Sequence, residues 1–202
     1  MTLLRKLRGE LETPRLLLRR WKPLDYEAFL AIAGDPQVML SSGAKPAMTL
    51  QEGEVQFHRA MRDENCYALV VKATGQPIGK IKFQKDLRRF RVNSLSIGYE
   101  LRRDHWGRGY MPEALSAMIR CAFEDRGVEV LAISHFAGND RSRRVIEKCG
   151  FRREGTILRG FRRFDGEVFD DVCYSITREE YFAHPERYEV PVRNGKGTDS
   201  NG

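Results

Sequence analysis

Two glycines separated by one residue, Gly107 and Gly109, would allow the backbone to approach a phosphorylated ligand closely. They follow a predicted strand, Leu95 to Leu101, and precede a predicted helix that has Pro112 in its first turn. The free amides at the start of that helix would point at an anion, and the helix dipole would favour negative charge there by ~0.3–1 kcal/mol. Arg108 adds a positive side chain at the same place. The segment therefore predicts a phosphate-binding turn.

The spacing of the two glycines differs from that of two common phosphate-binding motifs. A nucleoside-triphosphate loop requires Gly-x-x-x-x-Gly-Lys followed by Ser or Thr, which does not occur here. A dinucleotide-binding fold requires a third glycine and a downstream acidic residue at a strand end, and the chain lacks both. The turn is therefore predicted to serve a phosphorylated ligand of another kind.

The composition is that of one globular domain with an excess of positive charge. The chain has 202 residues, 41% of them hydrophobic, which fits a single packed domain. Its net charge of +7 favours anionic partners, either nucleic acid or a phosphorylated cofactor. The arginines occur as scattered pairs rather than as one block, which is more typical of solvated faces than of a nucleic-acid footprint.

Neither a membrane segment nor a secretory signal is predicted. No stretch approaches the ~20 apolar residues that a membrane span needs, and charges interrupt the apolar residues at the N-terminus. The four cysteines, Cys66, Cys121, Cys149 and Cys173, are widely spaced and form no CxxC pair, which favours reduced core thiols over a zinc site. We therefore expect a cytoplasmic protein with no membrane partner and no metal.

Hydrophobic periodicity and turn residues predict alternating strands and helices. Around the two glycines, a strand is followed by a Gly-rich turn and a helix that Gly127 ends. The absence of repeats and of an interdomain linker indicates one α/β (α+β) domain around a mixed sheet. The predicted strands are 15–21, 67–71, 78–83, 95–101, 128–135, 151–164 and 168–176, and the predicted helices are 25–33, 49–62, 112–123 and 141–148.

Three ordered blocks of the sequence resemble the GNAT acetyltransferase superfamily, most closely its RimJ/RimL-type branch. The first is the stretch 97–115, although the family's loop usually has Arg or Gln where this chain has Trp106 and Gly or Ala where it has Met111. The second is 139–151, which is similar to the branch's Asn-x-x-Ser-x-x-x-x-Glu-Lys-x-Gly-Phe segment. The third consists of Glu-Thr-Pro-Arg-Leu near the start and Asp-Gly with Asp-x-x-x-Tyr-Ser near the end, so the blocks cover about residues 12–182.

The resemblance implies a fold, a reaction and a set of partners. It implies one GNAT-like domain over residues 12–182, with a mixed sheet that splays between the fourth and fifth strands and helices on both faces. Residues 1–11 would be an N-terminal extension and 183–202 a polar, flexible tail. The implied reaction moves an acetyl group from acetyl-CoA, as cosubstrate, to a primary amine without a metal. The acceptor would be a small amine or a protein N-terminus such as that of a ribosomal protein, and a homodimer is compatible with the family.

The resemblance also implies which residues contact the cofactor. The pantetheine arm would pair with the backbone near Leu101, whose amide would polarise the thioester carbonyl. Either Arg143 or Arg144 would reach the adenosine 3′-phosphate, and Asn139 would contact the pantetheine arm or merely cap its helix. The implied cofactor-binding residues are Leu101, Trp106, Gly107, Arg108, Gly109, Tyr110, Met111, Asn139, Ser142 and Arg144.

Acetyl transfer to an amine requires a group that accepts the ammonium proton. Glu100, at the end of the strand that precedes the glycines, is the candidate general base, directly or through a water. The alternative is a surface carboxylate paired with Arg102 or Arg103. Glu113 and His135 are weaker candidates. A capping role is more typical of Glu113 than a substrate contact, and a lone histidine such as His135 is more often packed or solvated than catalytic.

The leaving thiolate must also be stabilised. Ser142 is the candidate general acid, because the resemblance places it on the helix that borders the sulfur, and its alternative role is to satisfy a backbone amide. Tyr174, in the last predicted strand, is a further candidate that core packing also explains.

Two other functions remain open at the level of sequence. A non-catalytic module could bind RNA or ribosomes through basic and aromatic residues, and the Phe-Arg-Arg-Phe segment 161–164 has that composition. A transferase on the same scaffold could use a different acyl donor, since the glycine turn does not distinguish short acyl groups. The acceptor would be selected by residues 38–48 and by the hairpin near 165–166, which carry no diagnostic pattern.

Overall fold

The computed structural model describes residues 9–189, which form one eight-stranded mixed sheet in the order β1-β2-β3-β4-β5-β6-β8-β7. All neighbouring strands are antiparallel except β5 and β6, which are parallel. The strands are β1 (Leu11–Glu12), β2 (Leu16–Arg19), β3 (Cys66–Val71), β4 (Pro77–Lys85), β5 (Ser94–Leu101), β6 (Val130–Phe136), β7 (Arg152–Arg162) and β8 (Val168–Thr177). The prediction of one α/β domain around a mixed sheet is confirmed.

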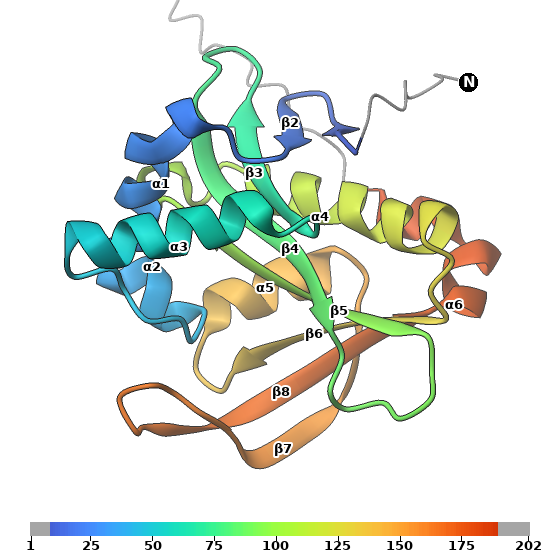
Figure 1. The fold of residues 1–202 in the computed structure, drawn as a ribbon. Coiled ribbons are helices and arrows are strands. Elements are labelled where there is room, and N and C mark those ends of the chain that lie inside the picture. Colours follow the sequence, from blue (N-terminus) through green and yellow to red (C-terminus); the bar gives the residue numbers. More distant parts are fainter. Residues whose placement is uncertain (1–8, 190–202) are drawn as a thin grey trace, which may run out of the picture.

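Helices cover both faces of the sheet (Figure 1). The α-helices are α1 (Tyr26–Ala33), α2 (Pro36–Ser41), α3 (Leu50–Arg62), α4 (Tyr110–Arg120), α5 (Asp140–Lys148) and α6 (Arg178–Ala183). Short helical turns are η1 (Pro23–Asp25), η2 (Arg103–His105), the π-helical η3 (Cys121–Asp125) and η4 (Pro185–Tyr188). Helices α4 and α5 pack on one face, whereas α1 and α3 pack on the other, and strand alternation sends successive side chains into the two cores.

The feature of the fold that positions the site is the divergence of β5 from β6. The two strands pair only from Ser94 with Val130 to Ile97 with Ile133, although β5 continues to Leu101 and β6 to Phe136. Beyond these pairs the two strands leave a gap in the middle of the sheet. The predicted splay between these strands, the fourth and fifth of the sequence prediction, is confirmed.

Two helices were not predicted from the sequence. Pro36 follows α1 and was expected only to end it, but it also begins α2, where Asp35 accepts a hydrogen bond from the Gln37 amide at 3.0 Å. Helix α6 begins at the capping box of Thr177 and Glu180. The fold thus continues past the predicted boundary at 182, since Tyr188 is buried against the α4 core.

Other predictions from the sequence concern the terminal segments, membrane-spanning helices and the state of the cysteines. Residues 1–8 of the predicted extension and 190–202 of the predicted tail lie outside the described residues. No helix within 9–189 is long and apolar enough to cross a bilayer. All four cysteines are buried and unbridged, as predicted. Burial raises the pKa of Cys66 to about 11 and that of Cys149 to about 12.

Candidate functional site

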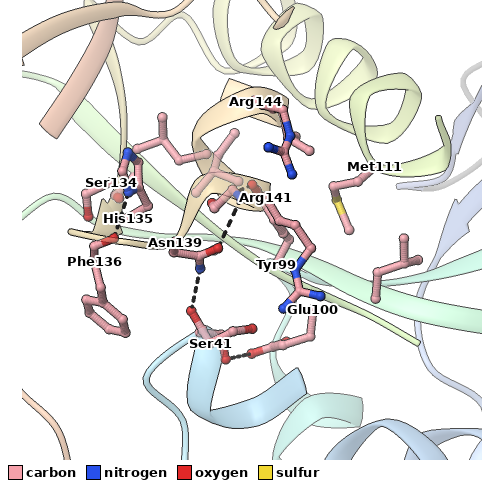
Figure 2. Close-up of a pocket in the computed structure, with 18 of the residues that line it drawn as sticks. Ser41, Tyr99, Glu100, Met111, Ser134, His135, Phe136, Asn139, Arg141 and Arg144 are labelled. Carbon is pink, nitrogen blue, oxygen red and sulfur yellow. Dashed lines mark hydrogen bonds between the residues drawn. The ribbon is translucent and has the colours of Figure 1, made fainter. Parts of the chain in front are cut away.

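A cavity of about 980 Å³ lies at the gap between β5 and β6. On the α4 side it is lined by the glycine turn, the start of α4 and one face of α5. On the α2 side it is lined by the end of α2, the β4–β5 loop and part of β7. We call these two halves the α4 lobe and the α2 lobe. Figure 2 shows side chains from both halves that converge on one space.

In the α4 lobe, the glycine turn has the backbone conformation that the sequence predicted. Gly107 and Gly109 have φ angles of 73° and 77°, which residues with a side chain rarely adopt. Gly109 is the N-cap of α4, and no side chain caps this helix. The amides of residues 107–111 donate to no acceptor within 9–189. A row of unpaired N–H groups with the positive end of a helix dipole is a site for a phosphate-like anion.

Trp106 connects this turn to the end of β5. Its indole Nε1 donates a hydrogen bond to the Leu101 carbonyl at 2.8 Å. The guanidinium carbon of Arg141, on α5, lies 3.8 Å from the centroid of its ring. The tryptophan therefore does more than pack, because it hydrogen-bonds to the end of β5 and its ring holds the Arg141 guanidinium beside the α4 lobe.

Several cations face the α4 lobe, but Arg108 is not one of them. Arg141, Arg144 and Lys148 line the cavity along α5. The Arg108 side chain is exposed and lies outside the lining. Arg143 is held by Asp140 at 3.1 Å and Glu147 at 3.2 Å. Of the two arginines considered for a 3′-phosphate, the structure thus brings Arg144 to the cavity.

The end of β5 presents free backbone groups to the gap. Arg102 donates to the Ile78 carbonyl at 2.8 Å, so this pair is hydrogen-bonded across β4 and β5. Because pairing alternates along antiparallel strands, the amide and carbonyl of Leu101 point away from β4 and toward the gap. The Leu101 carbonyl accepts the hydrogen bond from the Trp106 indole, and the Leu101 amide is left to donate to a ligand. This arrangement fits the predicted role of Leu101.

A pair of hydroxyl groups borders the gap on the α5 side. Tyr99 Oη and Ser142 Oγ are 2.8 Å apart. Burial raises the pKa of Tyr99 above its usual value, despite the opposing hydrogen bond to Ser142. The Ser142 amide donates to Asn139 Oδ1 at 3.2 Å, so Asn139 caps α5 as one of its two predicted roles requires. Ser142 and Tyr99 together can supply a proton at the gap.

Asn139 also joins the two lobes (Figure 2). Its Nδ2 donates to the Ser41 carbonyl at 3.1 Å, which links the start of α5 to the end of α2. The next residue, Ser42, donates from its hydroxyl to Glu100 Oε1 at 3.0 Å. The C-terminal end of α2 is therefore attached to both sides of the gap.

Glu100 faces the α2 lobe and is buried rather than exposed. Its Oε2 lies 3.2 Å from Lys80 Nζ, directly across the antiparallel pair of β4 and β5. The alternative role for Glu100, a surface carboxylate paired with Arg102 or Arg103, is wrong, because these side chains pair instead with Asp104 and Asp35, respectively. Each Glu100 oxygen keeps a lone pair for a further donor, since a carboxylate has about four acceptor positions.

The other candidate catalytic residues have their polar groups engaged within the protein. His135 lines the cavity, but its Nδ1 donates to the Phe136 carbonyl at 2.8 Å, and its Nε2 is 3.2 Å from Tyr174 Oη. Tyr174 is 1% exposed, and burial raises its pKa. Glu113 lies outside the cavity lining and bonds to Arg15 at 2.6 Å, which favours a structural role. These three residues form internal hydrogen bonds instead of facing a ligand.

The far wall of the α2 lobe is aromatic. The rings of Phe136 and Phe161 have centroids 4.8 Å apart, and both line the cavity. A β-carbon on Gly43, in the α2–α3 loop, would lie 2.7 Å from Phe136. The two segments expected to select the acceptor therefore meet at this wall, since Gly43 belongs to one and β7 to the other.

The β4–β5 loop closes the α2 lobe on its other side. Arg88 pairs with Asp171 and donates to Ser134 Oγ at 3.1 Å. Part of the Phe-Arg-Arg-Phe segment is engaged within the protein, because Phe161 lines the cavity and Arg163 pairs with Asp165 at 2.7 Å. The other two residues of the segment, Arg162 and Phe164, are exposed.

The residues of the site that the sequence reasoning missed include Tyr99, Lys80, Ser42 and Arg141. For Tyr99 a signal was present, because it alternates with Leu95, Ile97 and Leu101 on a face predicted to be buried, where a tyrosine hydroxyl needs a partner. No local pattern distinguishes the other three from ordinary surface residues, since their partners are distant in the sequence.

Comparison with known proteins gives the family. The model of the acetyltransferase (GNAT) domain matches residues 15–152. The uncharacterized N-acetyltransferase YoaA of Bacillus subtilis (strain 168) is 28% identical over 173 residues, which is 83% of this chain and 96% of that protein. A GNAT-family acetyltransferase structure from Bacillus anthracis shares the fold, with a TM-score of 0.76 at 24% identity over 85% of this chain and 99% of that one.

A more distant structure also shares the fold. The ribosomal-protein-S5-alanine acetyltransferase from Vibrio fischeri has a TM-score of 0.67 at 18% identity, over 85% of this chain and 98% of that one. The family match and the relatives favour an enzyme over a non-catalytic RNA-binding module. The chain belongs to the GNAT acetyltransferase family and is an acyltransferase.

Proposed function

We propose that this protein transfers an acetyl group from acetyl-CoA to a primary amine, as an enzyme of the RimJ/RimL-like branch. One observation carries the proposal: the unpaired amides of residues 107–111 open into the same cavity as a buried carboxylate on β5. The amides fit a diphosphate, and the Arg141, Arg144 and Lys148 side chains fit further phosphate charge. A donor bound there would extend along the gap toward Glu100.

Acetyl-CoA supplies the reactive thioester. The residues of the chain would orient this thioester and transfer protons to and from the reacting groups. The Leu101 amide, which points into the gap, would donate to the carbonyl oxygen as negative charge develops. Glu100, which forms an ion pair with Lys80, would accept a proton from the acceptor ammonium directly or through a water. The neutral amine then forms the new C–N bond as the C–S bond breaks, and the nitrogen releases its second proton to water to leave the neutral amide.

The departing thiolate takes a proton from the hydroxyl pair on the α5 side. Tyr99 remains protonated at neutral pH because burial raises its pKa. Ser142 lies within hydrogen-bond distance of it, so one hydroxyl can donate while the other orients it. The base and the acid therefore face the gap from opposite sides of the sheet.

The charges of the α2 lobe favour a monoamine acceptor over a polyamine. Its two carboxylates are each paired with a cation, Glu100 with Lys80 and Asp171 with Arg88, and Lys85 adds a further positive charge to the lining. A polyamine site needs unpaired carboxylates, and the described lining offers none. The aromatic wall would hold the apolar part of a small amine or of the first residue of a protein N-terminus, such as that of a ribosomal protein.

Two measurements test the proposal. Calorimetry with acetyl-CoA should show binding by the wild-type protein and none by Gly109→Glu, which places a carboxylate among the anion-binding amides. A folded wild-type protein that does not bind acetyl-CoA would refute it. Propionyl-CoA in the same titration separates this donor from related acyl donors.

The second measurement is a thiol-release screen. It should find turnover with N-terminal peptides or small monoamines and less with spermidine or aminoglycosides. With the best acceptor, Glu100→Gln should lower kcat/KM about a hundredfold at pH 7 and less at high pH, where the amine deprotonates without help. An unchanged rate would remove Glu100 as the base.

A further inference from the structure

Arg15, in the turn between β1 and β2, contacts the glycine turn from outside the cavity. Its Nη1 donates to the carbonyl of Arg108 at 3.0 Å, and its guanidinium carbon lies 4.5 Å from the centroid of the Tyr110 ring. A β-carbon on Gly109 would lie 3.4 Å from its Nη2. Arg15 itself does not line the cavity. It therefore touches the turn on the side opposite the ligand space.

This contact determines the direction of one amide. The carbonyl and the N–H of a trans peptide point in opposite directions, and residues 9–189 contain no cis peptide. Since the Arg108 carbonyl points to Arg15, the N–H of Gly109 in the same peptide points to the cavity. Without this contact the peptide could rotate, because one of the two torsions beside it is the φ of Gly109, where no side chain restricts rotation. A rotated peptide would present an oxygen to an anion.

Glu113, in the first turn of α4, holds Arg15 in this position. Its Oε2 accepts from Arg15 Nε at 2.6 Å, and its Oε1 accepts from the Arg15 amide at 2.8 Å and from Thr13 Oγ1 at 2.6 Å. The Glu113 side chain is only 3% exposed. Because Glu113 neutralises Arg15, the pair adds little net charge at the turn, and its effect there is one of geometry.

We infer that Arg15 is a positioning residue for donor binding: with Glu113 it orients the Arg108–Gly109 peptide so that the Gly109 amide faces the diphosphate. The inference rests on the proposed function, since it assumes that a CoA diphosphate occupies the turn. It assigns a role to the Thr-Pro-Arg segment before β2, which is distant in sequence from every other residue of the α4 lobe.

The test compares two donors that differ in the diphosphate. S-acetylpantetheine carries the thioester and the pantetheine arm but lacks the phosphates. Arg15→Lys keeps the charge and loses the forked geometry, so it should raise the Kd for CoA about tenfold, the effect of one lost hydrogen bond to a charged group. Its kcat/KM with S-acetylpantetheine should stay within about twofold of wild type, because no contact with that donor changes. Glu113→Gln should show the same selectivity with a smaller effect.

The matched control is Lys72→Met. Lys72 forms an ion pair with Glu12 at 2.7 Å next to the same turn and does not touch the glycine segment, so this variant should bind CoA as the wild type does. An unchanged CoA Kd in folded Arg15→Lys and Glu113→Gln would overturn the inference. An equal loss with both donors would also overturn it, because that pattern indicates general destabilisation. If the wild type binds no CoA, the proposed function itself fails. If the wild type binds CoA and both variants bind it equally well, this inference alone fails.

Discussion

The buried ion pair of Lys80 and Glu100 makes a prediction that can be worked from the structure. The side chains are 15% and 8% exposed, and their Cα atoms are direct partners across β4 and β5. Burial is the largest effect on the pKa of Lys80 and would lower it, but the charge of Glu100, the nearby Cys66 and the hydrogen bond to Glu100 together raise the pKa. Lys80→Met removes the charge and keeps most of the aliphatic length. It would leave a buried carboxylate with Ser42 as its one remaining partner among the described residues.

Removing one member of a buried ion pair costs about 3–5 kcal/mol, because the other charge stays desolvated. For a protein of this size each kcal/mol corresponds to about 2–4 °C in Tm, so Lys80→Met should melt about 6–20 °C lower. The double variant Lys80→Met/Glu100→Gln buries no charge and should recover much of this loss. The sum of the stability losses of the two single variants should therefore exceed the stability loss of the double variant by about 2 kcal/mol or more.

Thermal or urea unfolding of the four proteins measures this cycle. Because the pKa of Lys80 is raised on folding, its stabilisation is fully present below its unfolded value of 10.5 and is lost as the pH rises through the folded value. The difference in the free energy of unfolding between wild type and Lys80→Met should thus be constant near pH 7–9 and should decrease only at alkaline pH. Additive single losses, or a Lys80→Met protein as stable as wild type, would refute the buried pair as described.

Three further substitutions have expected outcomes. Trp106→Phe removes the hydrogen bond to the Leu101 carbonyl and should raise KM for the donor about three- to tenfold with a small change in Tm. Asp25→Asn should cost about 2–4 kcal/mol at pH 7, because it breaks the buried pair with Arg19. Burial would raise the Asp25 pKa, yet Arg19 lowers it overall, so the pair stabilises above pH 3.8 and urea titrations should show the deficit vanish as pH falls below that value. Gly43→Ala would force a left-handed residue and a β-carbon 2.7 Å from a phenylalanine ring, so acceptor KM should rise while CoA affinity stays constant.

The parts of the site that the sequence predicted depend on local backbone chemistry. Gly107 and Gly109 have positive φ, as a turn that approaches a ligand requires, and residue type alone indicates this conformation. Asn139 caps α5 through a contact three residues away. The strand before the glycine turn and the helix after it are indicated by hydrophobic residues that recur every two and every 3.6 residues, respectively. Such features involve neighbours in the chain, so a single sequence contains the information.

The parts that the sequence did not predict are contacts between distant segments. The only partners that the sequence suggested for Glu100 were the next two arginines, as an alternative to its role as base, but the antiparallel register of β4 and β5 places it opposite Lys80. Arg15 and Glu113 are 98 positions apart, and only the packing of α4 beside β2 brings them together. Helix α2 was not predicted because a proline such as Pro36 is typical both after the end of one helix and at the first position of another.

The end of β5 explains how one short segment can serve the three proposed requirements of acyl transfer. Successive side chains of a strand point to opposite faces, so Tyr99 meets Ser142 on the α5 side while Glu100 meets Lys80 and Ser42 on the other. The loss of pairing with β6 after Ile97 leaves the Leu101 amide free between the two faces. The proposed proton donor, proton acceptor and oxyanion donor thus are three consecutive residues, and their order follows from strand geometry and the gap in the sheet. Shifting the β4–β5 register by one residue would place Glu100 in the α4 core and remove the proposed base from the acceptor, whereas closing the gap would pair the Leu101 amide with β6.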